Sequence, residues 1–151
     1  AITGPILRRV VAQSKDIERA VVMVQQEVAE RWAAEPGSKT YGAPTVFLTA
    51  VYAVQLVRVV PPDAFHPPPR VTSAVVRLTP LATPRADPEH PRFKQLVKAA
   101  FGARRKTLRN AWKSVDGAID AMSAVGIDPG ARGETLSVEQ FEAVNRHLGS
   151  S

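Results

Sequence analysis

The spacing of apolar and polar positions predicts alternating helices and strands in the first eighty residues. Apolar residues recur at helical intervals after Pro5, which suits a first helical turn. Residues 21–24 form a continuous apolar run, which is typical of a strand buried on both faces. The pattern then predicts a second helix over 28–34, ended by a Pro-Gly pair. Residues 45–60 are apolar throughout and are expected to form a helix followed by a strand.

Prolines divide the rest of the chain. A proline-rich stretch over 61–69 cannot pair as a strand and is expected to be extended. Residues 71–78 (VTSAVVRL) follow as a strand. Residues 81–91 hold three prolines and little to bury, which predicts a linker.

The pattern beyond the linker is helical. Residues 93–101 and 108–115 each carry an apolar face, and Gly102 is expected to interrupt the helix between them. Gly126 is a candidate helix C-cap, and Ser137 opens a capping box ahead of the last helix. We therefore predict an α/β part (1–80), a linker (81–91) and a small all-α domain (92–151).

Composition excludes several kinds of site. The 151 residues include no cysteine, and the three histidines lie far apart without acidic partners, so no metal site is expected. There is no glycine-rich phosphate loop and no nucleophile elbow. The sequence shows neither a signal peptide nor an apolar run long enough to span a membrane, so we expect a cytoplasmic protein.

Positive charge is concentrated in one segment. Residues 85–113 contain nine basic and two acidic residues, a local net charge of +7 in a chain whose total is +6. Such a segment is typical of a surface that binds a polyanion. The alternative is an ordinary solvated helix face. The local charge favours phosphate binding by the sequence RRKTLRN (104–110), where arginines can contact phosphates in a bidentate manner.

The proline-rich loop presents one aromatic side chain. In the sequence FHPPPRVTS (65–73), prolines can hold the Phe65 ring in a fixed, partly exposed position, where it could stack on a nucleobase. The alternative is that Phe65 plugs the end of the sheet, and spacing alone favours this second interpretation.

Four blocks of the sequence together resemble the rRNA adenine dimethyltransferases, and within them the small-subunit (KsgA-type) enzymes. The blocks are VVMVQQEVAERWAAEPGSKTYGAPTV (21–46), FHPPPRVTSAVVRL (65–78), FGARRKTLRN (101–110) and GIDPGARGETLSVEQF (126–141). The opening residues AITGP (1–5) are similar to the end of that family's catalytic motif, N-L-P-Y-x-I-[ST]-x-P. The resemblance thus implies a C-terminal fragment, with Asn-Leu-Pro-Tyr immediately before Ala1.

The resemblance implies the end of a Rossmann-like methyltransferase domain followed by a helical rRNA-binding domain. The parent enzyme would use S-adenosylmethionine to dimethylate two adjacent adenines near the 3′ end of small-subunit rRNA, in the assembling 30S subunit. The fragment would hold no catalytic residue and no cofactor-binding residue, and would be inactive alone. The alternative is a non-catalytic RNA-binding or ribosome-assembly module.

The resemblance also assigns roles to residues. Phe65 matches a base-stacking aromatic, in a loop with Pro67, Pro69 and Ser73. The resemblance therefore favours stacking of Phe65 on a base over its packing at the end of the sheet. The expected rRNA contacts are Lys94, Lys98, Arg104, Arg105, Lys106 and Arg109. No membrane partner is expected. A strand edge left unpaired by the missing half could cause self-association.

Overall fold

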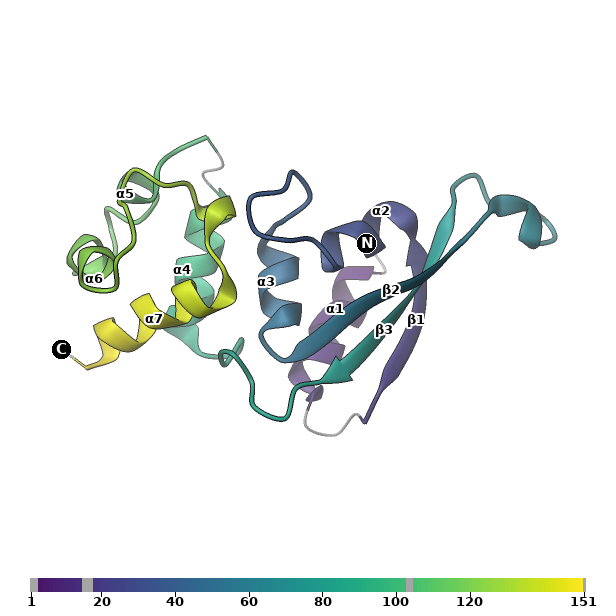
Figure 1. The fold of residues 1–151 in the computed structure, drawn as a ribbon, viewed down its shortest axis with the longest axis horizontal. Helices are drawn as coiled ribbons and strands as arrows, with labels where there is room; N and C mark the ends of the chain where they lie inside the picture. Colours follow the sequence, from purple (N-terminus) through teal and green to yellow (C-terminus); the bar gives the residue numbers. More distant parts are fainter. Residues whose placement is uncertain (1–2, 15–17, 103–104, 151) are drawn as a thin grey trace.

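The computed structural model describes residues 3–14, 18–102 and 105–150. The first part consists of α1 (Thr3–Ala12), β1 (Ala20–Gln25), α2 (Gln26–Trp32), α3 (Ala43–Thr49), β2 (Tyr52–Val60), a 3-10 turn η2 (Pro62–Ala64) and β3 (Ser73–Pro80). The second part consists of α4 (Pro91–Gly102), α5 (Leu108–Ala111), α6 (Ala118–Ala124), a 3-10 turn η3 (Gly133–Thr135) and α7 (Val138–Gly149). The fold is thus α/β followed by helices, as predicted, and the two parts lie side by side along the long axis (Figure 1).

The sheet has the strand order β1-β3-β2, with both neighbouring pairs antiparallel. Strands β1 and β2 are therefore parallel to each other, and their carboxyl ends lie at the same edge of the sheet. The Tyr52 hydroxyl, at the amino end of β2, donates a hydrogen bond of 2.9 Å to the Val10 carbonyl near the end of α1. Helix α1 consequently begins at the edge where β1 and β2 end (Figure 1).

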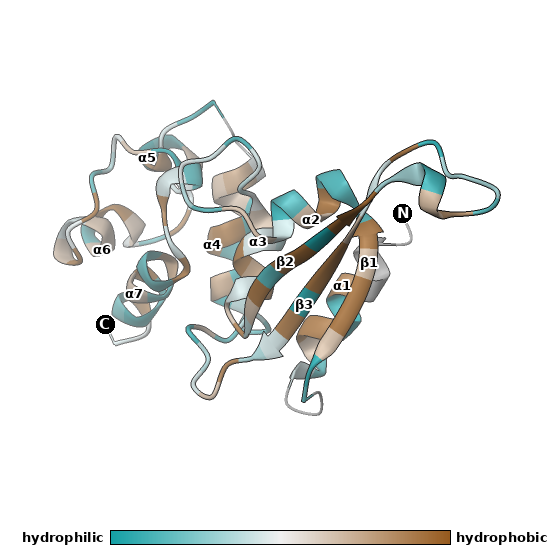
Figure 2. Cartoon of the chain, turned by 45° about the vertical axis from the view of Figure 1, so that its right-hand side comes forward, coloured by the Kyte–Doolittle hydropathy of each residue, from teal (hydrophilic) through white to brown (hydrophobic). Residues whose placement is uncertain are grey.

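Only one face of the sheet is covered. Helices α1, α2 and α3 pack on it (Figure 1), against side chains such as Val76 and Leu78 of β3, both of which are buried. On the opposite face Val21 is 59% exposed and Met23 is 54% exposed. The prediction of a strand buried on both faces is therefore wrong for this chain, because nothing among the described residues covers the second face of β1. Figure 2 shows β1 as predominantly hydrophobic nonetheless.

One buried core connects the sheet with the helices. The Phe47 ring of α3 meets the Phe93 ring of α4 edge-on, with 6.3 Å between their centroids. The Tyr41 hydroxyl donates a hydrogen bond of 2.6 Å to the Leu136 carbonyl, across 95 residues of sequence. Burial raises the pKa of Tyr41 well above the ordinary phenol value, and the carboxylates of Glu139 and Glu35 raise it further.

Local sequence signals in the helical part are confirmed. Helix α4 ends at Gly102, and Gly126 follows α6 with φ near +79°, a left-handed conformation that glycine adopts without strain. The Ser137 hydroxyl accepts from the Gln140 amide, while the Gln140 side chain accepts from the Ser137 amide. The apolar face predicted over 108–115 forms only the short helix α5, although Leu108 and Trp112 are buried as that pattern requires.

The segment between the two parts is packed against both of them. Contrary to the expectation that it buries little, Ala86 and Pro88 are buried. The Arg85 guanidinium donates to the Thr49 carbonyl at 2.6 Å and pairs with Glu139 at 3.2 Å. Arg85 thereby ties the end of α3 to the start of α7. Of the helices in the described residues, none is long and apolar enough to cross a membrane.

Candidate nucleic-acid interface

The proline-rich loop between β2 and β3 projects beyond the sheet at the carboxyl edge of β1 and β2 (Figure 1). Its base is held where β1 ends, because the Gln26 amide donates a hydrogen bond of 2.9 Å to the Thr72 carbonyl. In open α/β sheets, ligands bind outside the carboxyl ends of the strands. The loop therefore lies where the fold is expected to place a ligand.

The Phe65 ring is half-buried and is absent from the set of apolar side chains that pack against the core. Its amide donates to the Pro62 carbonyl at 3.2 Å, which closes the short turn before it. This position does not support the interpretation of Phe65 as a plug for the end of the sheet. A partly exposed ring on a proline-bounded turn can instead offer one face to a planar ligand.

The other loop residues predicted as part of this site surround Phe65 in the chain. Pro67 and Pro69 are exposed, and the peptide bond between His66 and Pro67 is cis. Ser73 is half-buried and begins β3, paired with Gln25 on one side and Val60 on the other. Ser73 is thus fixed by the sheet, whereas the two prolines lie in the part of the loop that solvent reaches.

Three cations of the basic segment are engaged within the protein. Arg85 holds α3 and α7 together, as described above. The Arg92 guanidinium donates to the Asn145 side-chain oxygen at 2.7 Å and to the Asn145 carbonyl at 2.9 Å. Lys94 is half-buried and pairs with Glu89 at 3.0 Å. Their side chains contribute to packing, so the segment offers less free charge than its sequence suggests.

The other cations of the segment that the structure describes are exposed, Lys113 among them. Lys98 lies on α4, Arg105 and Lys106 lie in the turn between α4 and α5, and Arg109 lies on α5. Arg104 lies outside the described residues. The α5 turn is anchored because the Leu108 amide donates to the Ala131 carbonyl at 2.8 Å. The exposed cations around α5 are therefore carried by a fixed turn of the backbone.

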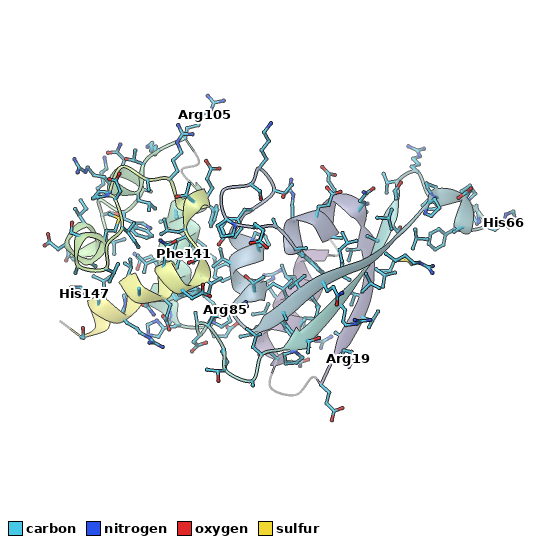
Figure 3. All side chains as sticks on the ribbon, in the orientation of Figure 1. Arg19, His66, Arg85, Arg105, Phe141 and His147 are labelled. Carbon is cyan, nitrogen blue, oxygen red and sulfur yellow. The ribbon has the colours of Figure 1, made fainter. Side chains whose placement is uncertain are left out.

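The two candidate surfaces are not brought together. Figure 3 shows His66, the neighbour of Phe65, at one end of the long axis and Arg105 near the other. The histidines His66 and His147 are likewise at opposite ends, and the described residues contain no cluster of three potential metal ligands. A single ligand that touches both the Phe65 loop and the Arg105 turn must consequently extend along the molecule.

Comparison with known proteins establishes the family. Residues 1–148 match the Ribosomal RNA adenine dimethylase family, and this chain belongs to it. Similar proteins include "Ribosomal RNA small subunit methyltransferase A" of Myxococcus xanthus (strain DK1622), 46% identical over 98% of this chain. The protein of that name from Anaeromyxobacter sp. (strain K) is 47% identical, also over 98% of this chain. The chain spans about half the length of these relatives, 55% and 54% respectively.

Solved structures confirm the fold. A dimethyladenosine transferase from Plasmodium falciparum superposes with a TM-score of 0.86 at 21% identity, over 99% of this chain and 64% of that chain. The 23S rRNA methyltransferase ErmE superposes with a TM-score of 0.71 at 22% identity, over 99% of this chain and 62% of that one. The arrangement of the sheet followed by helices is thus the same as in these two solved structures.

Sequence reasoning did not identify Arg8 of α1 and Phe47 of α3 as potential ligand contacts. Both line a cavity against α4, in the company of Lys98. The residues that meet there lie up to 90 positions apart in the chain, and no local spacing could have related them. Only the packing of α1, α3 and α4 brings them together.

Proposed function

We propose that the protein containing this chain uses S-adenosylmethionine to dimethylate the exocyclic amines of two adjacent adenines near the 3′ end of small-subunit rRNA. It would act during ribosome assembly in the cytoplasm. The observation that carries the proposal is the position of Phe65, on a projecting loop at the carboxyl edge of β1 and β2. The membership of the chain in the rRNA adenine dimethylase family supplies the substrate class.

The geometry gives Phe65 a role in holding the base. An adenine amine is reached only when the base leaves its stack and enters a pocket. A base placed at the carboxyl edge would stack on the partly exposed Phe65 ring, which the turn from Pro62 holds in place. Because α1 begins at the same edge, groups on a segment directly before α1 would face the stacked base.

The cofactor would supply an electrophilic methyl group, and we expect its site to lie outside the described residues. A nucleoside cofactor in this class of fold is held by a glycine-rich turn between a strand and a helix. Among the described elements, only α2 follows directly on a strand, and its junction is Gln25-Gln26, without glycine. The cofactor would therefore bind to segments other than those described, and no catalytic step is assigned to residues of this chain.

The basic turn would hold the RNA at a distance from the reacting base. Arg105, Lys106 and Arg109 are exposed and can each neutralise a phosphate. Since they lie far from the Phe65 loop (Figure 3), an RNA that reaches both must be large and folded. Such a surface recognises the position of the RNA backbone and the shape of the RNA more than the identity of its bases.

The base-stacking role is tested in the full-length protein with small ribosomal subunits that lack the methylation. Stacking of one base contributes about 1–3 kcal/mol, so Phe65→Ala is expected to slow methyl transfer roughly 5- to 150-fold. Phe65→Trp should retain most of the activity because it keeps an aromatic face. Val71→Ala is the matched control, since Val71 is an exposed apolar residue near the end of the same loop. Equal activities for Phe65→Ala and Val71→Ala would contradict the assignment.

The phosphate contacts are tested by charge reversal. Arg105→Glu combined with Lys106→Glu should weaken rRNA binding and reduce the dependence of its affinity on salt concentration. An unchanged salt dependence would exclude phosphate contacts by these two side chains.

A second candidate function is a non-catalytic RNA-binding module, favoured by the lack of a glycine-rich turn between a strand and a helix among the described residues. This candidate predicts rRNA binding by the full-length protein without any transfer of methyl groups. A methyl-transfer assay on small subunits therefore separates the two candidates.

A further inference from the structure

A cavity of 520 Å³ opens between α1, the start of α3, α4 and the segment that precedes α4. Its floor is apolar and is formed mainly by the partly or fully buried Leu7, Val11 and Phe47, and the exposed Pro44 also lines the cavity. The Phe47 ring is half-buried and packs edge-on against the buried Phe93 ring, so its orientation is fixed by the core. The floor is thus a preformed apolar surface with one aromatic ring.

The rim of this cavity is cationic. Arg8 comes from α1, and Lys94 and Lys98 come from successive turns of α4. Glu89 also lies on the rim and pairs with Lys94 at 3.0 Å. The ion pairs formed among the described residues leave Arg8 and Lys98 unpaired, and both side chains are exposed. Three cations and one carboxylate give the rim a net charge of +2.

We propose that this cavity binds an unpaired nucleotide of the RNA substrate. The base would lie on the floor against Phe47, and the flanking phosphates would contact Arg8 and Lys98. An apolar platform bordered by unpaired cations is the arrangement with which proteins hold single-stranded RNA, because every base has an apolar face and every linkage carries a negative charge. The volume is also sufficient for one nucleotide, since ligand pockets commonly measure about 300–1,000 Å³.

The cavity extends the basic surface of the helical part toward the sheet. Lys98 lies on α4, and the same helix leads through Gly102 to the turn with Arg105 and Lys106. Arg8 lies on α1, which belongs to the part that carries the Phe65 loop. A strand of RNA held in the cavity would therefore contact both parts of the chain. The inference rests on the proposed function, because it takes RNA as the partner.

The test uses the full-length protein and a fluorescein-labelled RNA with the 3′-terminal stem-loop of small-subunit rRNA. Affinity is measured by fluorescence anisotropy over a range of salt concentrations. Each phosphate contact to single-stranded RNA contributes about 0.7 to the slope of log affinity against log salt. Arg8→Glu combined with Lys98→Glu should lower this slope by about 1.4 and weaken binding roughly 10-fold or more.

A matched double variant controls for net charge. Arg19→Glu combined with Arg31→Glu makes the same change in charge at two exposed cations that lie outside the cavity and form no ion pair among the described residues. This variant should retain a slope close to that of the unmodified protein. If the two double variants behave alike, the cavity does not contact phosphates and the inference is wrong.

Cross-linking tests the base contact without any substitution. Ultraviolet irradiation of the complex, followed by digestion and mass spectrometry, should give a nucleotide attached to a peptide that contains Phe47. Cross-links confined to other peptides would overturn the inference.

Two further outcomes are informative. If the cavity variant binds RNA normally but loses affinity for the assembled subunit, the occupant is a ribosomal protein and the inference is wrong. If the unmodified protein fails to bind the RNA at all, the proposed function fails as well. Normal binding by both double variants would refute the inference alone.

Discussion

The hydrogen bond from Tyr41 to Leu136 gives the sharpest prediction about how the two parts of the chain are held together. The phenol oxygen lies 2.6 Å from the Leu136 carbonyl, and Tyr41 is only 2% exposed. Tyr41→Phe keeps the ring, and so retains its contact with Phe101, whose centroid lies 5.8 Å away. The substitution leaves a buried carbonyl without this donor, which we expect to cost about 1–3 kcal/mol of unfolding free energy.

Urea denaturation measures this cost as a lower transition midpoint at an unchanged slope. Ser38→Ala is the control, because the Ser38 hydroxyl makes a local, exposed bond of 2.8 Å to the Glu35 carbonyl. The control should shift the midpoint little. A Tyr41→Phe variant as stable as the Ser38→Ala variant would refute the reasoning that this bond connects the two parts.

The raised pKa of Tyr41 adds a dependence on pH. Burial favours the neutral phenol in the folded state, while the unfolded state ionises near the ordinary value of about 10. The stabilisation is complete below that value and is lost as pH rises above it toward the higher pKa of the folded state. The stability of the unmodified protein should therefore fall above about pH 10, and Tyr41→Phe should weaken that fall. Parallel pH profiles for the two proteins would contradict this account.

Three further predictions concern packing and surface. A Cβ at Gly133 would lie 2.6 Å from the Ala100 Cβ, so Gly133→Ala should lower the melting temperature. Gly102→Ala is the control and should not lower it, because the space around Gly102 is open. Similar melting temperatures for the two variants would contradict the close packing of η3 on α4. Ser137→Ala removes half of the capping box and should cost about 1 kcal/mol in urea denaturation, whereas no loss would mean that the box does not stabilise α7. The 151-residue chain on its own should self-associate through the exposed sheet face that carries Val21 and Met23. Sedimentation velocity should show less association for Met23→Lys. An unmodified chain that stays monomeric at high concentration would contradict this prediction.

Local signals in the sequence predicted the elements well. Three of these features are the end of α4 at Gly102, the capping box at Ser137 and the turn at Gly126. Each depends on interactions within a few residues, so the local sequence is sufficient to predict it. The stretch over 61–69 was expected to be extended, but Pro62–Ala64 forms a 3-10 turn within it, because proline fits the first turn of a helix. The division into two domains with a linker stays a prediction.

The burial of side chains and their hydrogen-bond partners within the fold could not be predicted in the same way. The run from Val21 to Val24 reads as a doubly buried strand, but its exposure depends on which elements pack against it. Charge counting gave Arg92 the same weight as Arg105, because the sequence does not show that Asn145 lies beside Arg92 in the fold. These properties arise from contacts between distant parts of the chain.

The identity of the product tests the central proposal most directly. Small ribosomal subunits that lack the modification are incubated with the full-length protein and S-adenosylmethionine, and the rRNA is digested and analysed by mass spectrometry. N6,N6-dimethyladenosine is expected at two adjacent positions near the 3′ end of the small-subunit rRNA. Unmodified adenines there, or methyl groups found only in large-subunit rRNA, would contradict it.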